Sequence, residues 1–179
     1  TEKSNLSLEE ANKTVFEKLI GKTKTTVAEN EITGKQTPLV KLIDFDDWSA
    51  NSFVAINQFR IVTPGGPREG IIPDIVLFVN GLPFSVIECK DVDVTDPISE
   101  SINQIMRYAN TREDDFGIKE GEERLFHYNL FSIATHGEEA RFGTITGDFE
   151  YYLNWKDIFP EVYKTFDINS YSNEEEVRY

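Results

Sequence analysis

Near the start of the chain, apolar residues recur at every third or fourth position and predict an amphipathic α-helix. These apolar positions are Leu8, Ala11, Val15 and Leu19. Segment 7–10 reads Ser-Leu-Glu-Glu, which is a capping box: the serine begins the helix, and the glutamate three residues later bonds back to it. The glycine at position 21 ends the pattern.

In the middle of the chain, runs of β-branched and aromatic residues predict strands. One run spans 53–62. Two more apolar runs, 71–79 and 82–89, lie on either side of Asn80-Gly81, and this arrangement predicts a β-hairpin. Both hairpin strands are apolar on both faces. We therefore expect the hairpin to lie centrally in a sheet that is covered on each side.

A second helix and several shorter elements complete the predicted fold. Asp96-Pro97 is a typical helix start, and apolar residues at helical spacing continue the helix to about Arg112. Shorter apolar runs predict further strands at 39–43, 125–134 and 141–146, and the aromatic-rich segment 149–166 is expected to be helical in part. The whole pattern predicts an α/β fold in which helices flank a mixed sheet.

The size of the chain fits one domain. Its 179 residues, 39% of them hydrophobic, can bury one sizeable core. We therefore expect a single domain over 1–179, in which 167–179 is a solvated tail or linker. The chain begins with Thr1 rather than Met, which indicates a piece of a longer protein.

The cysteine content and the length of the apolar runs indicate in which cellular compartment the protein is found. No apolar run reaches the roughly 18 residues that a membrane span needs, and the N-terminus lacks the apolar core of a signal peptide. A single cysteine, Cys89, and two histidines rule out an internal disulfide and a closed zinc site. These features predict a cytosolic protein without a membrane segment.

The net charge limits what the chain can bind by itself. Eighteen Lys and Arg residues against thirty-two Asp and Glu residues give a charge of −14. Such a charge repels the phosphate backbone of nucleic acids. Any chemistry on DNA would therefore need cations at the site, and another domain or subunit would have to hold the DNA.

Three polar residues interrupt the apolar hairpin. Asp74 begins one strand, and Glu88 and Lys90 lie two positions apart at the end of the other, so they share a face. Two carboxylates at one end of a hairpin can bind a divalent cation such as Mg²⁺. The cation lowers the pKa of a bound water, and a nearby lysine can orient that water or stabilise developing negative charge. This set is suited to phosphodiester hydrolysis.

The helix that follows carries two further candidates. Gln104 and Tyr108 lie four positions apart and so project from one side of the helix. There Gln104 can contact a phosphate or a metal-bound water, and Tyr108 can support it. The plainer alternative is that Gln104 is solvated and Tyr108 only packs.

Other interpretations of these and further residues stay open. Charged residues at strand ends are common, and an aspartate after a proline is ordinary turn chemistry. His127 and His136 lack neighbours spaced for a metal and are assigned to the core or surface. Arg141 can contact DNA or pair with a carboxylate. The remaining aromatic candidates, which fit a core or an interface better than base stacking, are Tyr151, Tyr152 and Trp155.

The ordered motifs resemble a known family. Pro73-Asp74, Glu88-Cys89-Lys90 and Gln104 with Tyr108 resemble the PD-(D/E)xK nucleases that carry a Gln-x-x-x-Tyr helix. More closely, residues from about 6 to 158 resemble the N-terminal nuclease domain of the restriction (R) subunit of type I restriction–modification enzymes. Further segments that carry this resemblance are 42–45, Asn57-Gln58-Phe59, 75–83, Asn129, 137–143 and Trp155-Lys156.

The resemblance implies a restriction-endonuclease-like mixed sheet whose central hairpin carries the active site. It implies that Asp74 and Glu88 ligate Mg²⁺, with the Cys89 carbonyl as a possible further ligand. Lys90 would then be the catalytic lysine, and Gln104 and Tyr108 the accessory pair. The side chain of Cys89 stands where the family more often has an aliphatic residue, and we expect it to face the core.

The resemblance also implies partners. Family members cut DNA within a complex of modification and specificity subunits, after ATP-driven translocation by motor domains on the same R chain. Segment 21–23, Gly-Lys-Thr, mimics the end of a phosphate-binding loop, but Phe16 stands where the first glycine is required. ATP binding by this chain is therefore rejected.

One feature departs from the family pattern. The family usually has an acidic residue on an upstream helix; Glu9 or Glu10 can substitute for it here, although Glu10 is already assigned to the helix cap. The alternative from another functional class is a non-catalytic docking module that keeps the nuclease fold for assembly.

The register of the hairpin decides whether the carboxylates meet. With a strict two-residue turn at Asn80-Gly81, Asp74 would lie opposite Ile87 and point away from Glu88. We therefore expect a three-residue loop, 79–81, that places Asp74 opposite Val86. A bulge elsewhere in either strand would restore the shared face equally well.

Overall fold

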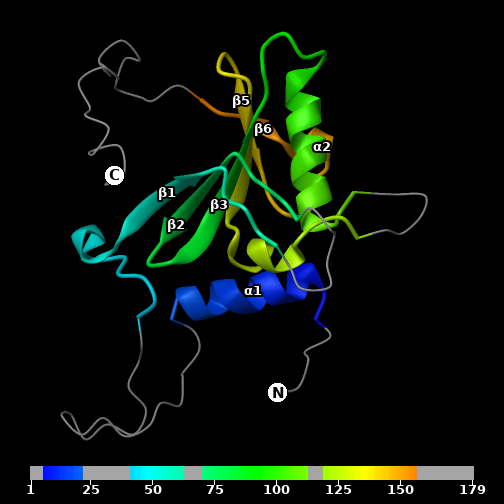
Figure 1. Cartoon of the computed structure of the whole chain (residues 1–179). Helices are drawn as coiled ribbons and strands as arrows, with labels where there is room; N and C mark the ends of the chain where they lie inside the picture. The colour runs from blue at the N-terminus through cyan, green and yellow to red at the C-terminus, as the bar shows by residue number, and fades with distance from the viewer. Residues whose placement is uncertain (1–5, 22–40, 63–69, 113–118, 157–179) are drawn as a thin grey trace, which may run out of the picture.

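A computed structural model describes residues 6–21, 41–62, 70–112 and 119–156 (Figure 1). Within them, six strands form one sheet in the order β1-β2-β3-β4-β5-β6. The strands are β1 Phe53–Asn57, β2 Ile75–Val79, β3 Leu82–Cys89, β4 Phe131–Thr135, β5 Ala140–Gly143 and β6 Leu153–Asn154. Only β3 and β4 pair in parallel; the other neighbours are antiparallel. The predicted mixed sheet of an α/β fold is confirmed.

The first helix, α1, spans Leu8–Leu19 and has the predicted capping box. The Glu10 amide donates to the Ser7 hydroxyl over 3.2 Å, and the Ser7 amide donates to the Glu10 carboxylate over 2.9 Å. On the same helix, the side-chain amide of Asn12 donates to three carbonyls of the segment 126–129. These bonds attach α1 to the 3₁₀ helix η2, Glu123–Tyr128.

The second helix, α2, spans Pro97–Ala109 and begins at the predicted Asp96 cap. It lies along the sheet (Figure 1) and contacts β3, β4 and η2. The apolar core lies between this helix and the sheet. Its most deeply buried members are Val76, Val86, Ile102, Phe126 and Ala134.

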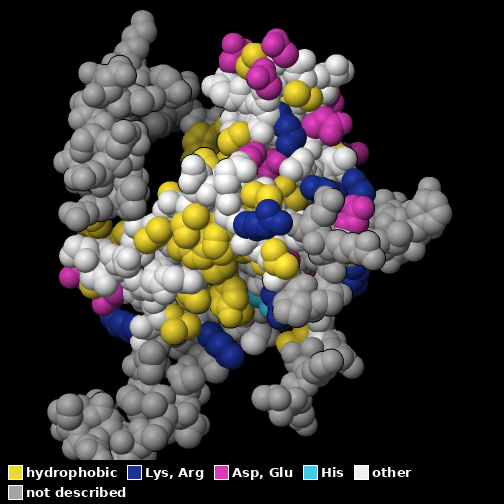
Figure 2. Space-filling view, in the orientation of Figure 1, with side chains coloured by type: hydrophobic (Ala, Val, Ile, Leu, Met, Phe, Trp, Pro, Cys, Tyr) yellow, Lys and Arg dark blue, Asp and Glu magenta, His cyan; other side chains and the backbone are white. Residues whose placement is uncertain are grey.

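The opposite face of the sheet is open in the part of the chain that the structure describes. Phe53, Leu77 and Phe131 line a shallow apolar hollow on it, and Figure 2 shows apolar side chains gathered over β2 and β3. Trp155, at the end of the same face, is 50% exposed. The expectation that both sides of the hairpin are covered is therefore wrong for the described residues, where helices cover one side.

Several predicted strands are shorter than expected or absent. Residues 42 and 43 form a bend and residue 41 has no regular structure, instead of the predicted strand, while 39 and 40 lie outside the described residues. Side chains from later in the chain bond the backbone here: the Asn80 side-chain amide donates to the Leu42 carbonyl, and the Asp44 amide donates to the side-chain oxygen of Asn51. These polar groups are no longer available for a strand ladder.

The segment predicted as a strand over 125–134 begins as the 3₁₀ helix η2, and the strand starts only at Phe131. The bonds from Asn12 hold η2 in a helical turn, and Leu125 and Phe126 point into the core. Of the segment 149–166, residues 149–156 are described, and they form the 3₁₀ turn η3 Phe149–Tyr151 and the strand β6. The part beyond 156, with the predicted tail, lies outside the described residues.

None of the described helices is long and apolar enough to cross a membrane.

Candidate active site

The hairpin of β2 and β3 brings the candidate residues to one end of the sheet. Val79 pairs directly with Leu82, so Asn80-Gly81 is a two-residue turn. Both turn residues have positive φ, 51° and 80°, as a type I′ turn requires. The predicted three-residue loop is therefore wrong. The Asn-Gly pair fits the tighter turn without strain.

A β-bulge in β3 shifts the register of the hairpin by one residue. Leu77 pairs with Ser85, whereas Phe78 pairs with Pro83, so Phe84 is the extra residue in β3. Beyond the bulge, Ile75 pairs with Ile87, and continuing this register places Asp74 opposite Glu88. Because paired residues share a face of a sheet, the two carboxylates lie on the face covered by α2. The alternative of a bulge elsewhere in the hairpin is confirmed, and the predicted pairing of Asp74 with Val86 is corrected.

The carboxylate of Asp74 is held from both neighbouring strands. Its Oδ2 atom accepts a hydrogen bond from the Cys89 amide over 2.8 Å. Its Oδ1 atom accepts one from the Gln58 side-chain amide over 2.7 Å. Asp74 therefore bridges the end of β3 and the residue that follows β1.

Glu88 is a buried carboxylate, with 1% of its residue surface exposed. Burial raises the pKa of Glu88 to about 7, while the hydrogen bond from Lys90 lowers it and the charge of Asp74 raises it. One of its oxygens, Oε2, has no hydrogen-bond partner among the described residues. An acceptor oxygen buried in this way is costly unless a proton or a cation occupies it.

Lys90 connects the hairpin to α2. Its Nζ atom donates to Glu88 over 2.9 Å and to the Gln104 side-chain oxygen over 2.8 Å. The amide of Gln104 then donates to the Tyr108 hydroxyl over 2.6 Å, which donates to the carbonyl of Ile72 over 3.1 Å. This chain of hydrogen bonds brings together the predicted Lys90, Gln104 and Tyr108. It differs from the plain alternative, in which Gln104 is solvated and Tyr108 only packs.

The residues present fit a hard divalent cation with an incomplete ligand shell. Two carboxylates lie opposite one another on one face of the sheet, and the unpaired Glu88 oxygen offers an oxygen ligand of the kind that Mg²⁺ prefers. No group of three or more His, Cys, Asp and Glu residues suited to a metal occurs among the described residues. Further ligands would come from a backbone carbonyl such as that of Cys89, from water or from a phosphate.

The Cys89 side chain is exposed, which corrects the expectation that it faces the core. Cys89 follows Glu88 and so points to the opposite face of the sheet. That face carries no covering helix within the described ranges. Its backbone amide, bonded to Asp74, is the part of Cys89 that shapes the site.

The other sequence candidates lie outside this cluster. Arg141 pairs with Glu139 over 2.7 Å, as one of its two predicted roles requires. His127 and His136 belong to no metal cluster in the described part of the chain. Glu10 serves its helix cap.

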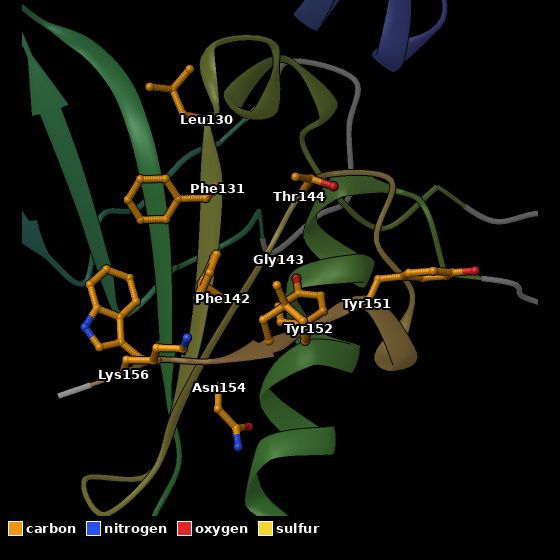
Figure 3. A pocket seen from close by; sticks show the side chains of 11 residues that line it. Leu130, Phe131, Phe142, Gly143, Thr144, Tyr151, Tyr152, Asn154 and Lys156 are labelled. Carbon is orange, nitrogen blue, oxygen red and sulfur yellow. The ribbon is translucent and has the colours of Figure 1, made fainter.

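The aromatic candidates surround a different hollow. Tyr152 is buried, whereas Trp155 lies against Phe131 and Phe142 with ring centroids 6.2 and 5.5 Å away. Figure 3 shows this hollow along β5 and β6, with the Tyr151 side chain directed away from Phe131. None of the catalytic candidates lines it.

Gln58 is a residue of the site that the sequence does not predict. The Asn57-Gln58-Phe59 segment carries part of the resemblance but indicates no role for it. Its hydrogen bond to Asp74 depends on the pairing of β1 with β2, which no local pattern encodes.

The raised pKa of Glu88 predicts a pH dependence of stability. Between its ordinary value of 4.5 and about 7, the folded chain keeps a proton that the unfolded chain releases. Stability should therefore fall as pH rises through this window. Glu88→Gln cannot ionise, so it should equal wild type near pH 4.5 and exceed it at pH 8 by up to about 3 kcal/mol. Urea unfolding at both pH values measures the difference. A variant no more stable than wild type at pH 8 contradicts the prediction.

Residues 1–151 match the family described as the N terminus of the type I restriction enzyme R protein. The chain belongs to this family. As an R-protein N-terminal domain, it is a domain of a type I restriction enzyme endonuclease subunit.

Curated relatives of this R-protein domain are also subunits of type I restriction enzymes. The type I restriction enzyme HindI endonuclease subunit of Haemophilus influenzae is 38% identical over 120 residues, which are 66% of this chain and 10% of that protein. The putative type I restriction enzyme MjaIXP endonuclease subunit of Methanocaldococcus jannaschii is 26% identical over 162 residues, which are 90% of this chain and 14% of that protein. The R-protein domain thus spans a small part of the length of these relatives.

Proposed function

We propose that this chain contributes a Mg²⁺-dependent nuclease site, formed by Asp74, Glu88 and Lys90, that hydrolyses phosphodiester bonds of DNA in a type I restriction enzyme. The observation that carries the proposal is the register of the hairpin. The bulge at Phe84 turns Asp74 toward Glu88, and Lys90 bonds to Glu88 on the same face.

Each residue has a chemical role in the proposal. The carboxylates of Asp74 and Glu88, with the Cys89 carbonyl as a further ligand, would hold the cation. When bound, the cation supplies a water of lowered pKa and compensates charge on the phosphate. Lys90 orients the attacking water or stabilises charge that develops on the phosphoryl oxygens.

Gln104 and Tyr108 act through Lys90. A free lysine side chain samples many rotamers, and the Gln104 oxygen, 2.8 Å from Nζ, limits them. The hydroxyl of Tyr108 fixes the Gln104 amide and also bonds the Ile72 carbonyl. The pair therefore sets the distance between Lys90 and the segment that carries Asp74.

The length of the curated relatives leads us to include partners in the proposal. The curated relatives are about seven to ten times longer than the matched segment, judged by its share of their length. We propose that motor domains on the same full-length chain use ATP, and that modification and specificity subunits complete the complex. The charge of −14 supports this division, because such a chain cannot hold DNA by counterion release.

Cleavage of a supercoiled plasmid by the assembled full-length enzyme tests the proposed function. Asp74→Asn keeps the size of the side chain and one acceptor oxygen but removes the charge that a cation needs. Cleavage should be lost while ATP hydrolysis stays at the wild-type rate. Asp148→Asn, at an exposed aspartate that caps η3 far along the chain, is the matched control and should cleave normally.

A second candidate function is a non-catalytic docking module. The open apolar face of the sheet, with Phe53 and Trp155 exposed, favours it, since apolar patches of this kind mark protein interfaces. This function predicts that Asp74→Asn cleaves the plasmid as well as wild type does. The same experiment therefore decides between the two functions.

A further inference from the structure

Gln58 has an unusual backbone for its residue type. β1 ends at Asn57, and Gln58 follows with a φ of 50°, in the left-handed region. A non-glycine residue in this region costs roughly 1–2 kcal/mol. Glutamine lacks the short polar side chain with which asparagine or aspartate lessens that cost by bonding locally. The surrounding contacts must compensate for it.

The contacts of Gln58 converge on Asp74. The backbone amide of Gln58 donates to the backbone carbonyl of Asp74 over 2.7 Å, and the backbone amide of Phe59 donates to the carbonyl of Pro73 over 3.1 Å. The left-handed turn thus keeps the backbone beside Asp74 after regular pairing of β1 has ended. In the same position the Gln58 side chain reaches Asp74 Oδ1 over 2.7 Å. Backbone and side chain of one residue both bind the same aspartate.

The two oxygens of Asp74 are therefore held from opposite sides. Gln58 holds Oδ1 from the side of β1, and the Cys89 amide holds Oδ2 from the side of β3. Two donors on a planar carboxylate fix both its rotation and its direction. Each carboxylate oxygen keeps a second lone pair, so these bonds leave Asp74 able to accept a cation.

The side-chain bond between Gln58 and Asp74 contributes little to stability. It lies at the protein surface, where a hydrogen bond adds about 1 kcal/mol or less. The two backbone hydrogen bonds, to the carbonyls of Asp74 and Pro73, already compensate for the left-handed backbone. What the bond does determine is where the carboxylate of Asp74 points relative to Glu88.

We propose that Gln58 is a positioning residue for Asp74: its amide holds the carboxylate in the orientation that binds a divalent cation together with Glu88. The inference rests on the proposed nuclease function. Groups that orient a ligating carboxylate typically change metal affinity or activity by about 10- to 100-fold when they are removed.

Titration of the nucleotide-free full-length protein with Mn²⁺, followed by electron paramagnetic resonance, tests the proposal. Gln58→Gly removes the amide, and glycine adopts a φ of 50° without strain. The dissociation constant for Mn²⁺ should rise about 10- to 100-fold, and plasmid cleavage by the assembled enzyme should require correspondingly more metal. A merely structural role would leave the affinity of the folded variant unchanged.

Two further variants keep the test decisive. Gln58→Asn also tolerates the left-handed backbone, but its amide is one carbon too short, so it should lose affinity as the glycine variant does. Asn80→Gly exchanges another left-handed residue, at the turn that ends the hairpin away from Asp74, and should bind Mn²⁺ like wild type.

The outcomes separate the two proposals. If Asp74→Asn abolishes cleavage but both Gln58 variants bind Mn²⁺ and cleave like wild type, the role of Gln58 is overturned and the nuclease function stands. If Asp74→Asn itself binds Mn²⁺ and cleaves normally, the nuclease function fails first. Weakened Mn²⁺ binding in both Gln58 variants, with Asn80→Gly unaffected, supports the positioning role.

Discussion

Replacing Lys90 with Ala should slow DNA cleavage by the assembled enzyme by about 100- to 1000-fold, the usual loss when one group that stabilises transition-state charge is removed. Two effects act together. The variant loses the positively charged ammonium group of Lys90, which in the proposal faces the reacting phosphate. It also leaves Glu88 buried without its 2.9 Å ion pair, which raises the pKa of Glu88 further and weakens its hold on Mg²⁺.

Single-turnover cleavage of a plasmid measures this loss, with ATP hydrolysis by the same complex as the internal standard. Lys119→Ala is the matched control. Lys119 also pairs with a glutamate, Glu123, but its side chain is 73% exposed and belongs to no part of the site. Cleavage by Lys90→Ala within about twofold of wild type, at unchanged ATP hydrolysis, would remove Lys90 from the active site.

The largest expected change in stability follows from truncating Phe126. Its side chain is fully buried in the core beneath α2, and it belongs to η2, which Asn12 attaches to α1. Phe126→Ala should lower the free energy of unfolding by about 3–5 kcal/mol, because it removes apolar contacts and leaves a cavity.

Urea unfolding of this chain measures the effect as a shift in the midpoint at constant slope. Phe45→Ala provides the comparison, since Phe45 is 69% exposed and its loss should change stability by less than about 0.5 kcal/mol. A loss below 1 kcal/mol for Phe126→Ala would mean that η2 does not belong to the cooperative core.

The elements whose signals are local could be predicted from the sequence. α1 begins at the predicted capping box, α2 at the predicted Asp96 cap, and β3 has the predicted bounds Leu82–Cys89. In each, a cap, a turn or an apolar period within about ten residues specifies the structure. Predictions of strands failed where side chains distant in sequence bind the backbone. Asn12 bonds the carbonyl of Phe126 in η2, and Asn80 bonds the carbonyl of Leu42, each across more than 35 positions.

The candidate site divides in the same way. Charges that interrupt an apolar hairpin predict Asp74, Glu88 and Lys90, and helical spacing predicts Gln104 with Tyr108. Hydrogen bonds connect Glu88, Lys90, Gln104 and Tyr108, and the hairpin register places Asp74 opposite Glu88. Their catalytic roles remain predictions. Gln58 could not be found this way, because its role depends on a left-handed backbone and on strand pairing, neither of which leaves a mark in neighbouring residues.

Because of the bulge at Phe84, the proposed chemistry depends on the number of residues in β3 as well as on their identity. If a relative lacked one residue between the turn and Val86, every signature residue would still be present and equally spaced within its own strand. Asp74 and Glu88 would nevertheless point to opposite faces. Unless a longer turn or another bulge compensated, the proposed metal site would not form in such a protein, although its motifs would match. Under the proposed function, the number of residues between the two carboxylates, taken together with the turn and the bulge, therefore matters as much as the identity of the residues.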